Sequence, residues 1–313
     1  MSPDRGHDGR FAPSPTGELH LGNLRTALVA WLTARAAGGR FLLRIDDLDP
    51  DRSRPEHEAR QLGDLQRLGI DWDGAPARQS DRLERYGAAI VALVRDDLAY
   101  PCFCSRADVL AAATAPHGAG PEAPYPGTCA QFAPSDAARR VAAGEPHCLR
   151  ARAEGAQIEF DDLLLGRTGA DVDDFIVRRR DGVPAYNLAS PLDEADLAVD
   201  EVIRGADLAP TTPRQLWVAR ALGEREPRFA HLSLVVGADG DRLAKRHGAA
   251  SLTALAAAGT PPEQVLGWLA TTLGIGQFED ASAPVTIGDL VPHFRLDAVP
   301  RGDVRIDAAL AAR

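Results

Sequence analysis

A run of helical periodicity over residues 21–37 follows a proline-rich segment. At its start stand three residues of types that suit phosphate binding, His20, Gly22 and Asn23. The first turn of a helix presents unpaired N–H groups and a partial positive charge, which attract phosphate. Glycine lets a ligand approach the backbone closely, and the imidazole of His20 can donate a hydrogen bond to a phosphate oxygen. The pattern favours a phosphate site, although His20 could equally serve only as the helix cap.

Lys245 is the only lysine among 35 Lys and Arg residues, and it lies in the segment RLAKRHG, residues 242–248. A compact ammonium cannot always be replaced by a guanidinium, so a lysine retained in an arginine-rich chain marks a candidate point-charge site. Opposite the helix at His20, Lys245 could stabilise the charge that develops when a carboxylate attacks the α-phosphate of ATP. Taken alone, RLAKRHG is also typical of a solvated basic turn.

Five segments, in chain order, resemble landmarks of the class I glutamyl-tRNA synthetase family. RFAPSPTGELHLGN and RLAKRHG are similar to its two nucleotide-binding signatures, and RIDDLDPDR, YNLASPLDE and VIRGADL lie between them. The resemblance implies a ligase that uses ATP and Mg²⁺ to convert glutamate into glutamyl-adenylate. By position it implies an ATP site of His20, Gly22, Asn23, Arg242 and Lys245, with Lys245 and His20 catalytic, and a glutamate site of Arg10, Ser14, Asp46, Tyr186 and Arg204.

The chemistry of these residues suits glutamate, because arginines form paired hydrogen bonds with carboxylates and Asp46 can pair with the ammonium group. The chain departs from the family at three positions. Asp46 stands where Glu is usual, so Asp47 is an alternative partner for the ammonium group. Arg242 replaces a common Lys, and Ala244 replaces a common Ser, so one hydroxyl contact to the phosphates is expected to be missing.

Only residues 249–313 follow the second signature, too few for the helical anticodon-binding region of the full-length enzymes. The chain is therefore more similar to their truncated paralogues, the glutamyl-queuosine tRNA(Asp) synthetase family, which attaches glutamate to queuosine in the anticodon loop of tRNA(Asp). Two alternatives stay open. One is a shortened glutamyl-tRNA synthetase that charges the terminal adenosine, and the other is an inactive tRNA-binding paralogue, suggested by Asp46 and Ala244.

Resemblance to the truncated family also implies a zinc site with ligands spaced C-x-C and then Y-x3-C. Three thiolates and a phenolate oxygen could complete the tetrahedral coordination of a structural Zn²⁺ ion. His117 is a rival to the tyrosine, and Cys148 is expected to be a buried thiol. The positions that match the spacing are Cys102, Cys104, Tyr125 and Cys129.

The composition, with 45% hydrophobic residues, is that of a folded globular protein, and the net charge of −10 excludes a generally basic surface. Contacts to tRNA must then come from local clusters such as Arg178–Arg180, which could also be a solvated hairpin strand. No apolar run could span a bilayer, and the N-terminal segment lacks the apolar core of a secretory signal. We expect a cytoplasmic monomer without a membrane partner, in which four cysteines remain reduced.

The alternation of strand and helix signals in the first hundred residues predicts an α/β fold with a parallel sheet and covering helices, and the resemblance to class I synthetases implies that this sheet is of the Rossmann type. Residues 1–98 are expected to form the first half of the catalytic domain, and residues 200–250 its second half with the lysine loop. Residues 99–199 are expected to form an inserted, zinc-containing acceptor-type α+β subdomain. Residues 251–313 are expected to be a short helical C-terminal region without an anticodon-binding domain.

Overall fold

The computed structural model describes residues 6–105, 107–109, 125–237, 251–275 and 285–306. Three residues predicted from the sequence, His117, Arg242 and Lys245, lie outside these ranges. Within the described residues, no helix is long and apolar enough to cross a membrane.

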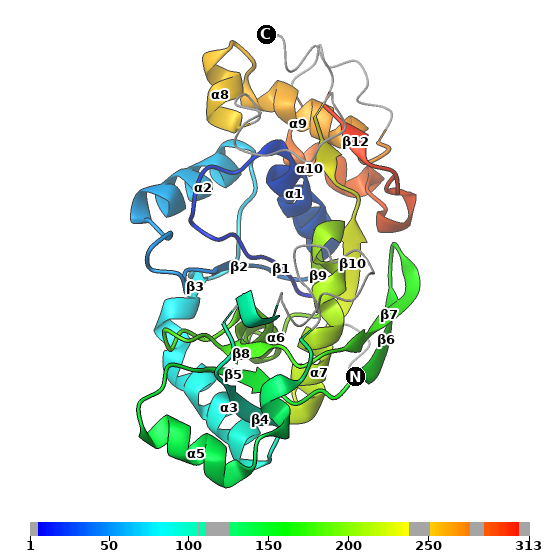
Figure 1. Cartoon of the computed structure of the whole chain (residues 1–313). Helices are drawn as coiled ribbons and strands as arrows, with labels where there is room; N and C mark the ends of the chain where they lie inside the picture. Colours follow the sequence, from blue (N-terminus) through cyan, green and yellow to red (C-terminus); the bar gives the residue numbers. More distant parts are fainter. Residues whose placement is uncertain (1–5, 106, 110–124, 238–250, 276–284, 307–313) are drawn as a thin grey trace.

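A central sheet forms the middle layer of the molecule (Figure 1). Within the described residues it has seven strands, and every neighbouring pair is parallel except the last. The predicted α/β class with a largely parallel sheet is therefore confirmed. In spatial order the strands are β3 (Ala77–Arg78), β2 (Phe41–Ile45), β1 (Gly9–Phe11), β9 (Glu201–Gly205), β10 (Arg228–Leu232), β6 (Ala156–Asp162) and β7 (Gly166–Val172).

Helices cover both faces of this sheet, because its inner strands carry apolar side chains on both sides. Leu43 and Ile203 belong to one buried cluster, whereas their neighbours Leu42 and Val202 belong to another on the opposite face. The first cluster includes residues of α1 (Leu21–Ala36), α2 (Pro55–Arg67), α8 (Leu252–Ala257), α9 (Pro262–Thr271) and α10 (Ile287–Leu290). The second includes residues of α3 (Leu83–Arg95), α6 (Tyr186–Asp196) and α7 (Thr212–Leu222).

A smaller antiparallel sheet consists of β4 (Ala99–Cys102), β5 (Cys148–Ala151) and β8 (Ile176–Arg178), with α5 (Pro134–Ala142) nearby. The other two strands of the segment 99–199 pair elsewhere, since the β6–β7 hairpin extends the central sheet beside β10. This segment therefore contributes to both sheets. The predicted domain boundaries stay a prediction. A short parallel pair, β11 (Val235–Val236) and β12 (Val304–Arg305), joins the C-terminal region to the end of β10.

Candidate active site

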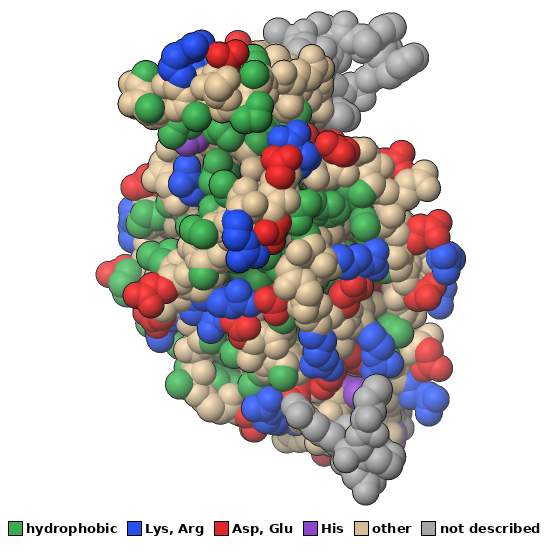
Figure 2. Space-filling model, turned by 90° about the horizontal axis from the view of Figure 1, so that it is seen from below, with side chains coloured by type: hydrophobic (Ala, Val, Ile, Leu, Met, Phe, Trp, Pro, Cys, Tyr) green, Lys and Arg blue, Asp and Glu red, His purple; other side chains and the backbone are tan. Residues whose placement is uncertain are grey.

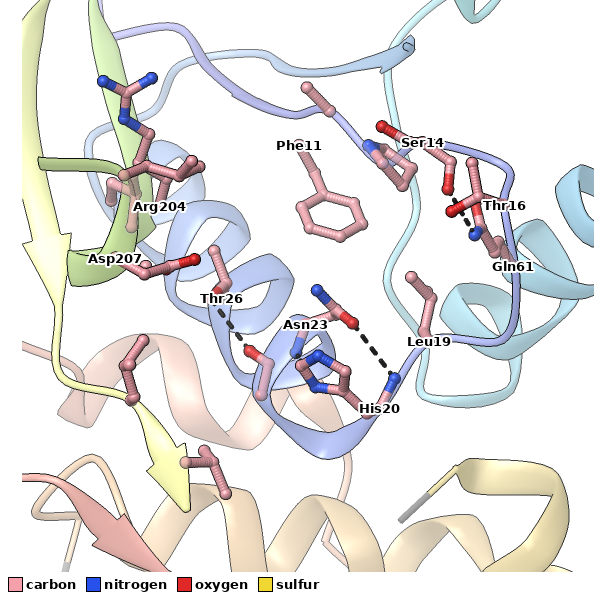
Figure 3. A pocket seen from close by; sticks show the side chains of 18 of the residues that line it. Phe11, Ser14, Thr16, Leu19, His20, Asn23, Thr26, Gln61, Arg204 and Asp207 are labelled. Carbon is pink, nitrogen blue, oxygen red and sulfur yellow. Dashed lines mark hydrogen bonds between the residues drawn. The ribbon is translucent and has the colours of Figure 1, made fainter. Parts of the chain in front are cut away.

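A cavity of about 390 Å³ opens where β1 and β9 end and α1 begins (Figure 3). The chain runs from β1 through α1 to β2 on one side, while β9 lies on the other side of β1. Such a reversal of strand order leaves a crevice at the carboxyl ends of parallel strands, where ligands of α/β proteins bind. Seven predicted site residues line it, namely Arg10, Ser14, His20, Gly22, Asn23, Tyr186 and Arg204, and Asp46 is not among the lining residues of the described chain.

His20 closes the N-terminus of α1 through reciprocal hydrogen bonds with Asn23. Its Nδ1 accepts from the backbone N–H of Asn23 (3.3 Å), and Oδ1 of Asn23 accepts from the backbone N–H of His20 (3.2 Å). A neutral imidazole that accepts at Nδ1 carries its proton on Nε2, where it can donate. Capping and phosphate binding are thus compatible roles, and the cap fixes which nitrogen can donate.

Gly22 has a packing reason to be glycine in addition to the predicted approach of a ligand. A Cβ atom at this position would lie 3.0 Å from both Cε1 and Nδ1 of the His20 ring. This is tighter than most real Cβ contacts, so a larger residue would push the imidazole aside by a few tenths of an ångström. The sequence pattern H-x-G therefore reflects contact between the two residues themselves.

The described residues on either side of segment 238–250 meet the same end of α1. Val235, in β11, lines the cavity, and a Cβ on Gly22 would lie 3.6 Å from it. Ser251 forms an isolated antiparallel bridge with His20 and caps α8. The flanks of the segment that contains Lys245 are therefore both anchored beside the helix N-terminus.

Arg204 is a buried cation on the cavity wall, and its hydrogen bonds to the described residues all go to neutral groups. Nη1 donates to the Tyr186 hydroxyl (3.2 Å) and to Oε1 of Gln215 (2.8 Å), and Nη2 donates to Oγ1 of Thr212 (2.7 Å). Nε donates to Nε2 of His231 (3.0 Å). Burial lowers the pKa of Arg204. These bonds use four of the five N–H groups of Arg204 and leave one on Nη2 without a partner among the described residues. A buried charge is costly unless it is paired, so this residue of the cavity wall is suited to an anionic ligand.

Arg10 lies next to this cation and is held by an acidic residue that sequence reasoning missed. Its Nε and Nη2 donate to Oε1 of Glu194 in α6 (3.2 and 2.7 Å), and Nη1 donates to the carbonyl of Ile203 (3.2 Å). Burial raises the pKa of Glu194, but Arg10, Arg44 and Arg204 lower it more, so the net shift is downward. The signal in the sequence was an acidic pair, Asp193-Glu194, in an otherwise largely buried helix.

Asp46 is almost completely buried, and its carboxylate is occupied by Arg44. Nε and Nη2 of Arg44 donate to its two oxygens (2.6 and 3.1 Å). Burial raises the pKa of Asp46 despite this pairing. Its backbone N–H donates to the carbonyl of Pro13 (2.9 Å), so it lies beside the first signature. Its role as partner of the ammonium group stays a prediction. The alternative, Asp47, accepts from the backbone and hydroxyl of Ser80 (2.9 and 2.6 Å).

The predicted zinc ligands come together at the end of β4, beside the short helical turn Thr128–Gln131. The sulfurs of Cys102, Cys104 and Cys129 lie within 4.8 Å of one another, and those of Cys104 and Cys129 are 3.5 Å apart. The Tyr125 hydroxyl lies 3.4 Å from Cys102 Sγ and 3.8 Å from Cys104 Sγ. A tetrahedron with Zn–S bonds of 2.3 Å has edges of about 3.8 Å, so these separations suit zinc. Cys148 is a buried thiol on the neighbouring strand, as expected.

Two residues of the predicted tRNA cluster already have partners within the protein. Arg179 forms an ion pair with Asp181 (2.6 Å) and lies 3.7 Å from Asp49. Arg180 donates to the carbonyls of Phe103 and Cys104 (both 3.0 Å), so it braces the segment that carries the zinc ligands. Figure 2 shows basic and acidic side chains interspersed over the face it presents. The tRNA interpretation of this cluster stays a prediction.

Comparison with known proteins agrees with this site. The family described as "tRNA synthetases class I (E and Q), catalytic domain" matches residues 8–282. A glutamate tRNA ligase from Elizabethkingia meningosepticum, solved in complex with its amino acid, superposes with a TM-score of 0.84 at 25% identity, covering 98% of this chain and 68% of that one. The fold and the site thus define a tRNA synthetase catalytic domain of class I.

Two curated relatives match over most of both chains. Both are named "Glutamyl-Q tRNA(Asp) synthetase": the protein of Nocardia farcinica is 53% identical over 88% of this chain and 87% of its own, and that of Symbiobacterium thermophilum is 48% identical over 97% of each. The chain therefore belongs to the class I tRNA synthetase family of the E and Q type, among relatives that carry the glutamyl-Q name. The resemblance seen in the sequence is confirmed.

Proposed function

We propose that this protein activates glutamate with ATP and transfers the glutamyl group to queuosine in the anticodon loop of tRNA(Asp). In the first step a glutamate carboxylate oxygen attacks the α-phosphorus of ATP, and pyrophosphate leaves. In the second, a hydroxyl of the queuosine ring attacks the acyl carbon, and AMP leaves. The relatives' name supports this substrate, and ATP use follows the chemistry of the class.

The observation that carries the proposal is the position of Arg204. Arg204, a buried guanidinium hydrogen-bonded to neutral groups, lines the cavity from β9, and the N-terminus of α1 with its His20 cap lines another side (Figure 3). The first group suits a carboxylate, and the second suits a phosphate. A site with both is equipped to bring the two reacting groups of adenylate formation together.

The remaining roles follow from the residues around the cavity. Arg10 and Tyr186 would help to hold glutamate, and Gly22 and Asn23 would shape the nucleotide end of the site. Lys245, with Arg242 nearby, would neutralise the charge on the phosphates together with a Mg²⁺ ion bound by ATP. Zn²⁺ on the three cysteines and Tyr125 would be structural, because all four positions are filled by protein ligands. We expect the protein to act as a monomer in the cytoplasm.

Two assays with purified protein test the proposal. Glutamate-dependent exchange of pyrophosphate into ATP, without tRNA, should be observed, because activation needs only the cavity. Labelled glutamate should then be transferred to tRNA(Asp) that contains queuosine, and neither to the same tRNA without queuosine nor to tRNA(Glu). Charging of tRNA(Glu) instead would indicate a shortened glutamyl-tRNA synthetase, and absence of both activities would indicate a binding protein.

A further inference from the structure

Three buried polar side chains form a line across adjacent strands of the central sheet and end at the cavity. Asp162 closes β6, His231 lies in β10, and Arg204 lies directly opposite His231 in β9. Oδ2 of Asp162 is 2.6 Å from Nδ1 of His231, and Nε2 of His231 is 3.0 Å from Nε of Arg204. Asp162 and His231 do not line the cavity, and both side chains are fully buried.

The neighbours of His231 determine which of its nitrogens carries the proton. An ionised carboxylate only accepts and an arginine Nε only donates, so Nδ1 must be protonated and Nε2 must be a bare acceptor. Thr212 fits the same scheme, because its oxygen accepts from Nη2 of Arg204 (2.7 Å) and its proton can point to Nε2 of His231 (3.2 Å). Burial lowers the pKa of His231, although Asp162 opposes the shift, so the ring stays neutral.

The two oxygens of Asp162 have different partners, although Oδ1 also accepts from the backbone N–H of His231 (3.3 Å). Oδ1 accepts the backbone N–H groups of Leu164 and Leu165 (both 2.9 Å), which fixes the turn of the β6–β7 hairpin. Oδ2 is left for His231. Burial raises the pKa of Asp162, but the hydrogen bonds from His231 and the two backbone amides lower it more, so the carboxylate stays ionised.

We infer that Asp162 and His231 are positioning residues for glutamate binding, which act by presenting a hydrogen-bond acceptor to Nε of Arg204. This fixes the orientation of the guanidinium of Arg204, a residue that lines the cavity. The inference rests on the proposed function, in which Arg204 receives a carboxylate of glutamate. It predicts that reversing the direction of the hydrogen bonds from Asp162 through His231 to Arg204, with side chains of nearly the same shape, is enough to weaken binding of glutamate.

Asp162→Asn makes this reversal. The Asn oxygen can keep the bonds to the hairpin backbone, while its NH₂ group faces His231 and donates to Nδ1. The proton of His231 then moves to Nε2, where it points at the N–H of Arg204, and two donors face each other. We expect the KM for glutamate in pyrophosphate exchange to rise about tenfold or more, with the KM for ATP changed less than about twofold, because a buried donor left without an acceptor is strongly disfavoured and Arg204 must shift to avoid it.

Two further variants separate this effect from loss of structure. His231→Gln keeps the direction of the bonds, because an amide can donate to Asp162 and accept from Arg204, so its KM for glutamate should rise clearly less than that of Asp162→Asn. Asp161→Asn makes the same chemical change at the neighbouring exposed carboxylate and should behave as wild type. An unchanged KM for glutamate in Asp162→Asn, or equal effects of Asp162→Asn and His231→Gln, would overturn the inference.

Nitrogen NMR of the imidazoles provides a test that needs no active variant. The His231 signal, assigned as the one missing in His231→Gln, should show a protonated Nδ1 and an unprotonated Nε2 in the wild type at pH 7. A protonated Nε2 there would overturn the inference even if Asp162→Asn failed to fold. Wild-type protein without glutamate-dependent exchange would contradict the proposed function instead, so the two failures are distinguishable.

Discussion

Nη2 of Arg10 lies 2.7 Å from Oε1 of Glu194, and this ion pair joins the first strand of the sheet to α6 with almost no exposure to solvent. Both partners also lie next to the cavity, since Arg10 lines it and Glu194 lies close enough to Arg204 to oppose the lowering of its pKa by burial. The pair therefore connects the stability of the fold with the charge of the site. Removal of the pair should therefore change both the free energy of unfolding and the binding of ligand at the site.

Glu194→Gln should lower the free energy of unfolding at pH 7 by about 3–5 kcal/mol, because it leaves Arg10 buried without its charge partner. The pKa of Glu194 is lowered in the folded protein, so its contribution is complete above the unfolded value and is lost as the pH falls through the folded value. The difference between variant and wild type should thus shrink below about pH 4. Urea unfolding at a series of pH values checks this, and a constant difference across the series would contradict it.

His20→Asn should separate capping from catalysis. Asparagine is a good N-cap residue, so the free energy of unfolding should change by less than about 0.5 kcal/mol. The variant lacks the Nε2 donor, so the rate of adenylate formation should fall by about 10²-fold. His20→Ala should lose the same rate and, in addition, about 1 kcal/mol of stability. Wild-type exchange by His20→Asn would leave His20 with a capping role only.

Gly22→Ala should reduce adenylate formation by displacing the His20 ring, which the new Cβ would approach to 3.0 Å. The reduction should be about tenfold or more, without a large loss of stability, since alanine favours the helix by about 1 kcal/mol. The double variant with His20→Asn supplies the control, because contacting residues are not additive. In that background Gly22→Ala should have little further effect, and a full additional loss would mean that Gly22 is needed for approach of the ligand.

Lys245→Arg should be among the least tolerated exchanges of one cation for another. The flanks of its segment are anchored at the N-terminus of α1, beside the proposed phosphate site. A guanidinium cannot reproduce a compact ammonium, so adenylate formation should fall on the order of 10²-fold or more. Single-turnover formation of glutamyl-adenylate measures this, and wild-type rates in the variant would refute the argument from the sole lysine.

The zinc site should be structural. Cys102→Ser and Cys129→Ser should lose bound zinc and melt at lower temperature, while Cys148→Ser should keep the metal, because its thiol is not part of the cluster. Tyr125→Phe and His117→Ala decide which residue is the fourth ligand. Metal analysis and thermal unfolding check these outcomes, and stoichiometric zinc with unchanged stability in both cysteine variants would show that the ligand set is wrong.

Local patterns in the sequence determined several features that the structure bears out. Helical periodicity predicts a helix over residues 21–37, and the structure has α1 at Leu21–Ala36 with His20 as its cap. Such features depend on neighbours within a few positions. The strand-helix alternation of the first hundred residues predicts the parallel sheet in the same way. The resemblance to the truncated family, carried by the C-x-C and Y-x3-C spacing, implies the three cysteines that meet in the cluster.

Only the tertiary structure decided what surrounds those residues. Arg204 meets His231 and Asp162 because three strands far apart in the sequence are neighbours in the sheet, and no spacing along the chain encodes that pairing. Asp46 is tied to Arg44, two positions away, and Arg10 to Glu194, because buried charges take the nearest opposite charge that the packing provides. Sequence signals report local geometry and residue chemistry, whereas the partner of a buried charge depends on which strands and helices are packed together.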